Sequence, residues 1–211
     1  MDALVAAAIH DAKNGLTALN TWLAEAQRES PSPAITEARA VATRVGAQLV
    51  ELLALYRAGE GSLRLAIDDH DLAAFCEEML DELALPLGPG MRIETHLEAA
   101  AQIGAWAFDA YQVKLVLLDA LRNALRHASS LVSLRIDLTP PEGLRFEISD
   151  DGPGYSDDIL AGSDTSMDSQ SSGLGLRFAR LIAQHHATPN GCHGRIELGN
   201  RVGAVFALIL P

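Results

Sequence analysis

Two carboxylates and two glycines follow one another in the segment Asp150-Asp151-Gly152-Pro153-Gly154, directly after a run that alternates like a strand. Carboxylates at the end of a strand are hydrogen-bond acceptors, and glycines permit a tight turn through which a ligand can approach the backbone. Such a segment could hold the polar edge of a small molecule. It is also a favourable turn sequence in its own right, so the motif alone is compatible with a purely structural role.

A second glycine motif, Gly173-Leu174-Gly175-Leu176, opens a segment with helical periodicity. The first N–H groups of a helix have no partner within the helix, and the helix dipole favours negative charge there. This helix start is therefore suited to a phosphate or another anion. It is neither a dinucleotide-binding fingerprint nor a P-loop, and a glycine-rich helix start without a ligand is the alternative interpretation.

A polar face is expected on the helix predicted for residues 109–127. Asp119 and Asn123 are four residues apart, and Arg126 and His127 follow within the next turn. Carboxylate and amide oxygens can hold a hydrated magnesium ion, while the basic side chains could contact phosphate. An exposed polar helix face without a ligand is the usual explanation for such a set.

A histidine with polar neighbours lies in the first helical segment, in His10-Asp11-Ala12-Lys13-Asn14. His10, Lys13 and Asn14 are about one turn apart and share a face of the helix. The ordinary pKa of an imidazole is about 6.5, so its neutral form is available as a nucleophile near pH 7. A structural or merely exposed histidine is the simpler interpretation of His10 taken alone.

The elements that must position these motifs begin with a pair of helices. Apolar residues recur at three-, four- and seven-residue spacings over residues 2–28 and 34–58, which predicts two amphipathic helices. Pro31 and Pro33 separate them, so they should form an antiparallel hairpin. Because a lone hairpin cannot enclose a core, we expect a second copy to complete a four-helix bundle, a homodimer through residues 1–58.

Strands and helices alternate in the rest of the chain, after a linker near residues 57–62. The predicted strands are residues 63–69, 91–97, 103–108, 131–138, 144–149, 195–198 and 204–210, and the predicted helices are 71–85, 109–127 and 174–186. Residues 155–172 show no convincing period. The predicted fold class is α+β, a helical hairpin in residues 1–60 followed by an α/β sandwich in residues 61–211.

The composition is that of a globular protein without a membrane segment. The 211 residues include 16 basic and 28 acidic side chains, and the net charge of −12 argues against binding to nucleic acid. Apolar runs are too short to span a bilayer and no secretion signal is evident, so we expect a cytoplasmic location. Cys76 and Cys192 form no metal or redox motif and no disulfide framework.

The order of the four motifs resembles the two-component sensor histidine kinases, over nearly the whole chain. In that family the hairpin dimerises and carries the phosphoacceptor histidine, and the next domain is the Bergerat-type ATP-binding sandwich shared with gyrase-type ATPases. The resemblance implies a kinase that phosphorylates itself on His10 from ATP and Mg²⁺. The phosphoryl group would then pass to an aspartate of a response regulator.

The same resemblance assigns roles to single residues. Asp11 is the acidic residue beside the phosphoacceptor, and Asn14 stands where family members with phosphatase activity toward the regulator carry threonine or asparagine. Asn123 matches the magnesium-binding asparagine, and Asp150 the aspartate that reads the adenine amino group. The glycine motifs flank an ATP lid at residues 155–172. The other residues expected to bind the nucleotide are Asp119, Arg126, His127, Gly152, Gly154, Gly173, Leu174, Gly175 and Leu176.

Three positions depart from the family's pattern. Gly15 stands where many members have proline, which should leave the first helix straighter. Residues 155–172 contain no Phe-x-x-Phe box, which affects the closing contacts of the lid. Asp119 stands where asparagine or glutamate is commoner, which adds negative charge near the metal. None of these departures removes a group that the chemistry requires.

A histidine phosphotransfer adaptor is the competing interpretation, since it also carries a histidine on a dimeric hairpin, beside a kinase-like domain that no longer binds ATP. The glycine motifs and Asn123 favour the kinase, because an adaptor has no use for them. A Bergerat-fold ATPase or an anti-sigma-type serine kinase would explain the sandwich but not His10 on a hairpin. Because only nine residues precede His10, we expect input from a separate sensor protein, or a chain that is a fragment of a longer kinase.

Overall fold

The structure is a computed structural model that describes residues 2–83, 90–140, 143–162 and 173–211, and the side chains of these residues except those of residues 2–6 and His10. The chain forms two compact units, Met1–Leu63 and Arg64–Pro211. No helix in the described parts of the chain is long and apolar enough to cross a membrane.

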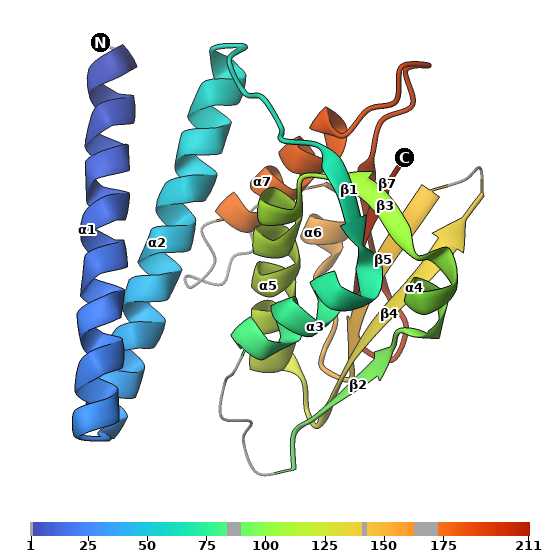
Figure 1. Ribbon diagram of the computed structural model, residues 1–211. Coiled ribbons are helices and arrows are strands. Elements are labelled where there is room, and N and C mark those ends of the chain that lie inside the picture. Colours follow the sequence, from blue (N-terminus) through green and yellow to red (C-terminus); the bar gives the residue numbers. More distant parts are fainter. Residues whose placement is uncertain (1, 84–89, 141–142, 163–172) are drawn as a thin grey trace. The chain divides into compact units, whose positions relative to one another are not determined.

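The first unit is a hairpin of two long helices (Figure 1). α1 spans Asp2–Glu29 and α2 spans Pro33–Gly59, which confirms the hairpin predicted from the apolar periodicity. Pro33 is the first residue of α2, a position where the missing N–H costs no helical hydrogen bond. α1 continues without a break through Gly15.

The second unit contains a five-stranded mixed sheet with the strand order β2-β4-β5-β7-β6. The strands are β2 (Arg92–His96), β4 (Leu131–Thr139), β5 (Gly143–Asp150), β6 (Arg195–Asn200) and β7 (Ala204–Leu210). β2 is parallel to β4, and the other neighbours pair antiparallel. β1 (Asp68–Asp71) and β3 (Ala105–Phe108) form a separate two-stranded antiparallel sheet.

Helices cover one face of the larger sheet (Figure 1). They are α3 (Leu72–Leu83), α5 (Ala110–His127) and α7 (Leu174–His185). α5 contacts β4 and β5, α7 contacts β6 and β7, and α3 packs on α5. Fully buried side chains such as Leu117, Leu121, Phe146 and Phe178 fill the space between helices and sheet. This layered α+β arrangement agrees with the predicted fold class.

The opposite face of the sheet carries a row of ion pairs. The Glu147 carboxylate, 7% exposed, accepts from Arg145 at 2.9 Å and from Arg201 at 2.7 Å. Arg145 also pairs with Glu197 at 2.6 Å, across the intervening strand β7. Ala207 on β7, the register partner of Glu147 and Glu197, is buried, and charged residues line this face of the sheet.

Three local predictions were wrong. The strand predicted at residues 63–69 begins only at Asp68. The neighbouring strand β3 has only four residues to pair with it, and the N–H of Ala66 donates to the Asp109 carboxylate instead of to a strand. α4 (Glu98–Ile103) was missed, and α6 (Asp157–Leu160) lies in a segment expected to be irregular. Both helices are too short to show a helical period. The other predicted elements are confirmed within a few residues where the structure describes them.

Candidate functional site

Asp150 is the last residue of β5, and the backbone fixes one oxygen of its carboxylate. Its Oδ1 accepts hydrogen bonds from the N–H groups of Gly152 at 2.8 Å and Ala204 at 3.1 Å. The residue is half-buried, and the part of the chain that the structure describes offers no partner to Oδ2. An oriented carboxylate with a free acceptor is suited to receive an N–H or O–H group of a ligand.

The carboxylate of the neighbouring residue, Asp151, is bound by groups of the protein itself. Its carboxylate accepts from the N–H groups of Ser129, Ser130 and Leu131 at 2.8 to 3.0 Å, and from the Ser130 hydroxyl at 2.7 Å. These donors hold the pKa of the Asp151 carboxyl well below its usual range. The connection from α5 to β4 is thereby tied to the end of β5. The Asp151 carboxylate is therefore bound within the protein, whereas the Asp150 carboxylate keeps one oxygen without a partner among the described residues.

Close packing explains the glycines of this turn. A Cβ on Gly152 would collide with the carbonyl oxygen of His127, at the end of α5. A Cβ on Gly203, before β7, would lie 2.5 Å from the Asp150 Oδ1. Gly154 has a φ of +82°, and a Cβ there would lie 2.8 Å from the Asn200 side chain. The turn after β5 is therefore enclosed by the end of α5 and by the β6–β7 connection.

Asn200, the last residue of β6, binds the backbone of Tyr155 at both polar groups. Its Oδ1 accepts from the Tyr155 N–H at 2.8 Å, and its Nδ2 donates to the Tyr155 carbonyl at 2.9 Å. Burial raises the pKa of the Tyr155 phenol, and the charges of Asp150 and Asp119 raise it further, so the three groups lie within electrostatic range. No sequence signal points to Asn200, because the contact joins positions 45 residues apart.

α5 places four of the predicted residues. The helix begins at its N-cap Asp109, whose Oδ1 accepts from the Gln112 N–H at 3.0 Å. Asn123 is half-buried, and its amide has no hydrogen-bond partner among the described residues. Arg126 and His127 are exposed, in the last turn of the helix.

Asp119 lies one turn before Asn123 on the same helix. It retains solvent contact, yet the protein around it raises the pKa of its carboxyl by desolvation, while Arg122 and Arg126 lower it. A carboxylate held in this environment adds negative charge next to the Asn123 amide.

α7 begins directly beside Asp119. Its N-cap Gly173 is buried and left-handed, with a φ of +65°, and a Cβ on Gly175 would collide with the Asp119 carboxylate. Leu174 and Leu176 are half-buried. The first turn of α7 therefore starts next to α5. The structure brings Asp119, Asp150, Tyr155 and Gly175 into one region of the second unit.

The remaining predicted site residues lie in the first unit, on α1. Asp11 and Asn14 are exposed and about one turn apart, whereas the side chain of His10 lies outside the described residues. Residues 163–172, most of the predicted lid, also lie outside them.

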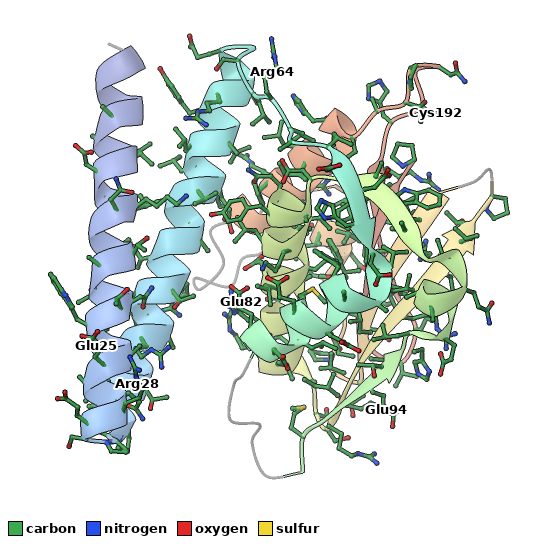
Figure 2. The ribbon with its side chains drawn as sticks, viewed as in Figure 1. Glu25, Arg28, Arg64, Glu82, Glu94 and Cys192 are labelled. Carbon is green, nitrogen blue, oxygen red and sulfur yellow. The ribbon has the colours of Figure 1, made fainter. Side chains whose placement is uncertain are left out.

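The described residues contain no group of three or more histidine, cysteine, aspartate or glutamate side chains able to hold a metal ion. Burial raises the pKa of Cys76 to about 12, and Cys192 is exposed in the loop between α7 and β6 (Figure 2). Both thiols are free.

Comparison with known families identifies the second unit. Residues 108–211 match the family described as histidine kinase-, DNA gyrase B-, and HSP90-like ATPase. Over 231 aligned residues the chain is 23% identical to the "Adaptive-response sensory kinase SasA" of Synechococcus sp. (strain JA-2-3B'a(2-13)). This alignment covers 100% of the chain and 59% of the curated relative, so the chain spans only part of that protein's length.

Several solved structures share the fold. The Acinetobacter baumannii histidine kinase AdeS has a TM-score of 0.59 and 17% identity, over 92% of this chain and 94% of that one. Full-length ShkA in complex with AMPPNP has a TM-score of 0.66 and 16% identity, over 100% and 46%. The nucleotide-free catalytic domain of histidine kinase ThkA has a TM-score of 0.56 and 17% identity, over 70% and 96%. The resemblance that the motif order indicated is confirmed.

Proposed function

We propose that this chain, whose residues 108–211 match the ATPase family of histidine kinases, is an ATP-dependent kinase that phosphorylates itself on His10. The observation that carries the proposal is the Asp150 carboxylate, held by two backbone N–H groups with Oδ2 left without a partner among the described residues. It lies in the part of the chain that matches the ATPase family, beside a glycine turn that packs closely against the end of α5 and against Asn200.

The residues of the second unit fit ATP. The free Oδ2 of Asp150 would accept the adenine amino hydrogen, and the positive end of the α7 helix dipole suits the phosphates. Gly175 lets this helix start lie directly against Asp119, since a Cβ there would meet the Asp119 carboxylate. Arg126 and His127 are exposed and available to phosphate oxygens. The Asn123 amide oxygen would hold Mg²⁺, which supplies charge neutralisation on the phosphates.

His10 supplies the nucleophile of the proposed reaction. A neutral imidazole nitrogen carries a lone pair and attacks the γ-phosphorus without prior deprotonation. The new N–P bond forms as the bond between the γ-phosphorus and the ADP oxygen breaks, and ADP leaves with that oxygen. Asp11, the next residue, would accept the hydrogen on the other ring nitrogen and orient the ring.

The phosphoryl group would then pass to an aspartate of a response regulator. Asn14 is proposed to orient the water that removes phosphate from this regulator, because its amide can donate to water without abstracting a proton. The regulator and a separate sensor protein are the partners that this function implies.

The hairpin is proposed as the dimerisation and phosphoacceptor domain. Large apolar side chains remain exposed on both helices, including Trp22, which is 65% exposed, and Leu52, which is 47% exposed. Leu19, Val41 and Val45 are exposed as well. A second copy of the hairpin would bury these side chains in a four-helix bundle.

Calorimetry with AMPPNP and Mg²⁺ tests the nucleotide site. The wild-type chain should bind the analogue, and Asn123→Ala should abolish binding. Glu94→Ala, an exposed position on β2 (Figure 2), serves as the matched control and should bind as wild type does. Absence of binding by the wild-type chain would favour the phosphotransfer adaptor.

Labelled ATP tests the phosphoacceptor. The wild-type chain should acquire an acid-labile label, and His10→Gln should lose the label while AMPPNP affinity stays nearly unchanged. An acid-labile label that persists in His10→Gln would move the acceptor to another histidine.

A further inference from the structure

We propose that Asn200 is a positioning residue of the nucleotide site, which fixes the turn between Asp150 and Tyr155 in its binding conformation. The inference rests on the proposed function, because it concerns the same site. Asn200 lies on β6, far along the chain from both glycine motifs, and it contacts the turn through its side chain alone.

The contact is specific to an amide. The Asn200 Oδ1 accepts from the Tyr155 N–H at 2.8 Å, and Nδ2 donates to the Tyr155 carbonyl at 2.9 Å. One side chain therefore satisfies both backbone groups of one residue, which requires an acceptor and a donor side by side. Aspartate when ionised offers only acceptors, and alanine offers neither.

The fit around this amide is close. Gly154 has a φ of +82°, and a Cβ there would lie 2.8 to 2.9 Å from the end of the Asn200 side chain. The left-handed backbone of Gly154 lets the chain approach the amide without a side chain in between. The conformation of the turn and the position of Asn200 therefore depend on each other.

The strand pairing links this contact to Asp150. Asn200 is the register partner of Ala204 across β6 and β7, and the Ala204 N–H holds the Asp150 Oδ1 at 3.1 Å. The Arg201 N–H donates to the Gly203 carbonyl at 2.9 Å and closes the connection between the two strands. One short β-turn thus fixes the carboxylate through Ala204 and the following backbone through Asn200.

The side chain of Tyr155 links the Asn200 contact to the candidate nucleotide site. Its half-buried phenol lies within electrostatic range of both Asp150 and Asp119, the carboxylates from β5 and α5. When Asn200 no longer holds the Tyr155 backbone, the ring is free to move with respect to both carboxylates. We therefore expect the affinity for the nucleotide to depend on Asn200, although Asn200 itself need not touch the ligand.

The test measures AMPPNP affinity in the presence of Mg²⁺, amide hydrogen exchange at Tyr155 without nucleotide, and the melting temperature. Asn200→Ala should weaken affinity at least about tenfold, which is ~1.4 kcal/mol, and accelerate exchange of the Tyr155 N–H at least about tenfold. Its melting temperature should stay close to that of wild type. Asn190→Ala, an exposed asparagine in the loop before β6, is the matched control and should change none of the three.

Asn200→Asp provides a second variant that separates positioning from bulk stability. The ionised carboxylate keeps the acceptor for the Tyr155 N–H and loses the donor, so exchange should stay slow while affinity falls.

The outcomes distinguish the two claims. Wild-type affinity in Asn200→Ala, in a protein that does bind AMPPNP, overturns the positioning role and leaves the proposed function intact. Wild-type exchange at Tyr155 in Asn200→Ala overturns it as well, because the two hydrogen bonds are then not formed. Failure of the wild-type chain to bind AMPPNP removes the proposed function and the positioning role together.

Discussion

Asp150 and Asp151 are chemically identical neighbours whose surroundings give them different tasks. Four donors from three residues surround the Asp151 carboxylate, whereas Asp150 has two donors on Oδ1 and none among the described residues on Oδ2. A mutation that keeps the shape of a carboxylate and changes its donor pattern should therefore affect the two positions differently.

Asp150→Asn should weaken nucleotide binding without unfolding the domain. The amide oxygen can keep the bonds from Gly152 and Ala204, while the amide NH₂ replaces the free acceptor and faces the adenine amino donor. Loss of a hydrogen bond to a charged group costs about 1.5–3 kcal/mol, so AMPPNP affinity should fall roughly 10- to 100-fold in calorimetry. A melting temperature several degrees below wild type would instead assign Asp150 a structural role.

Gly175 lies directly against a side chain of the neighbouring helix. Gly175→Ala places a Cβ against the Asp119 carboxylate, the end of an exposed side chain that would have to rotate away. We expect AMPPNP affinity to fall at least about threefold, since the displaced carboxylate lies beside the start of α7, while the free energy of unfolding in urea changes by less than about 1 kcal/mol. Gly199→Ala, where a Cβ meets nothing within 4 Å, is the control. Unchanged binding in Gly175→Ala would contradict the close approach.

His186 connects the end of α7 to the start of α5 and, through Asp109, to the segment before β1. Directly after α7, its Nε2 accepts from the Asp109 N–H at 3.0 Å and its Nδ1 donates to the Ile182 carbonyl at 2.8 Å. The Asp109 Oδ2 in turn accepts from the Ala66 N–H at 2.9 Å. Burial lowers the pKa of His186, which the hydrogen bond to Ile182 and the charge of Asp109 oppose.

The stability of the second unit should therefore fall as the pH falls below about 6.5. The folded pKa of His186 is depressed, so the unfolded chain binds the proton first, and stability is complete above the unfolded pKa of about 6.5 and declines below it. The decline is at most about 1.4 kcal/mol per pH unit for one group. Urea unfolding between pH 7.5 and 5.0 measures it, and His186→Gln should flatten the curve. Equal slopes in both proteins would show that His186 does not titrate on unfolding.

Local patterns and distant contacts explain what the sequence could and could not predict. The helices α1, α2 and α5 repeat their apolar period over many residues, and each glycine motif is contiguous in the chain, so the sequence alone predicts both. Asn200 and Gly203 matter through partners far along the chain, the turn after β5 and Asp150, and nothing in the neighbouring sequence marks them. The free Oδ2 of Asp150 depends on two N–H groups that bind only Oδ1, and one of them, that of Ala204, lies 54 residues away.

The whole molecule should be a dimer through its hairpin. Light scattering of the full chain should give about twice 22.5 kDa, because exposed apolar side chains on both helices need a partner. Trp22→Glu together with Val45→Glu puts charges on that surface and should shift the chain toward a monomer at micromolar concentration. Glu25→Gln, an exposed position on α1 (Figure 2), is the control. A monomeric wild-type chain at this concentration would refute the hairpin dimer.

The edge strands of the larger sheet in the second unit affect whether copies of the protein can associate edge to edge. Its edge strands are β2 and β6, and unpaired edges can join to the edges of other molecules and polymerise. β2 is only five residues long and exposes Arg92 and Glu94, and β6 exposes Arg195 and Glu197. Charged, short edges resist such joining, so concentrated protein should remain free of fibrous aggregates.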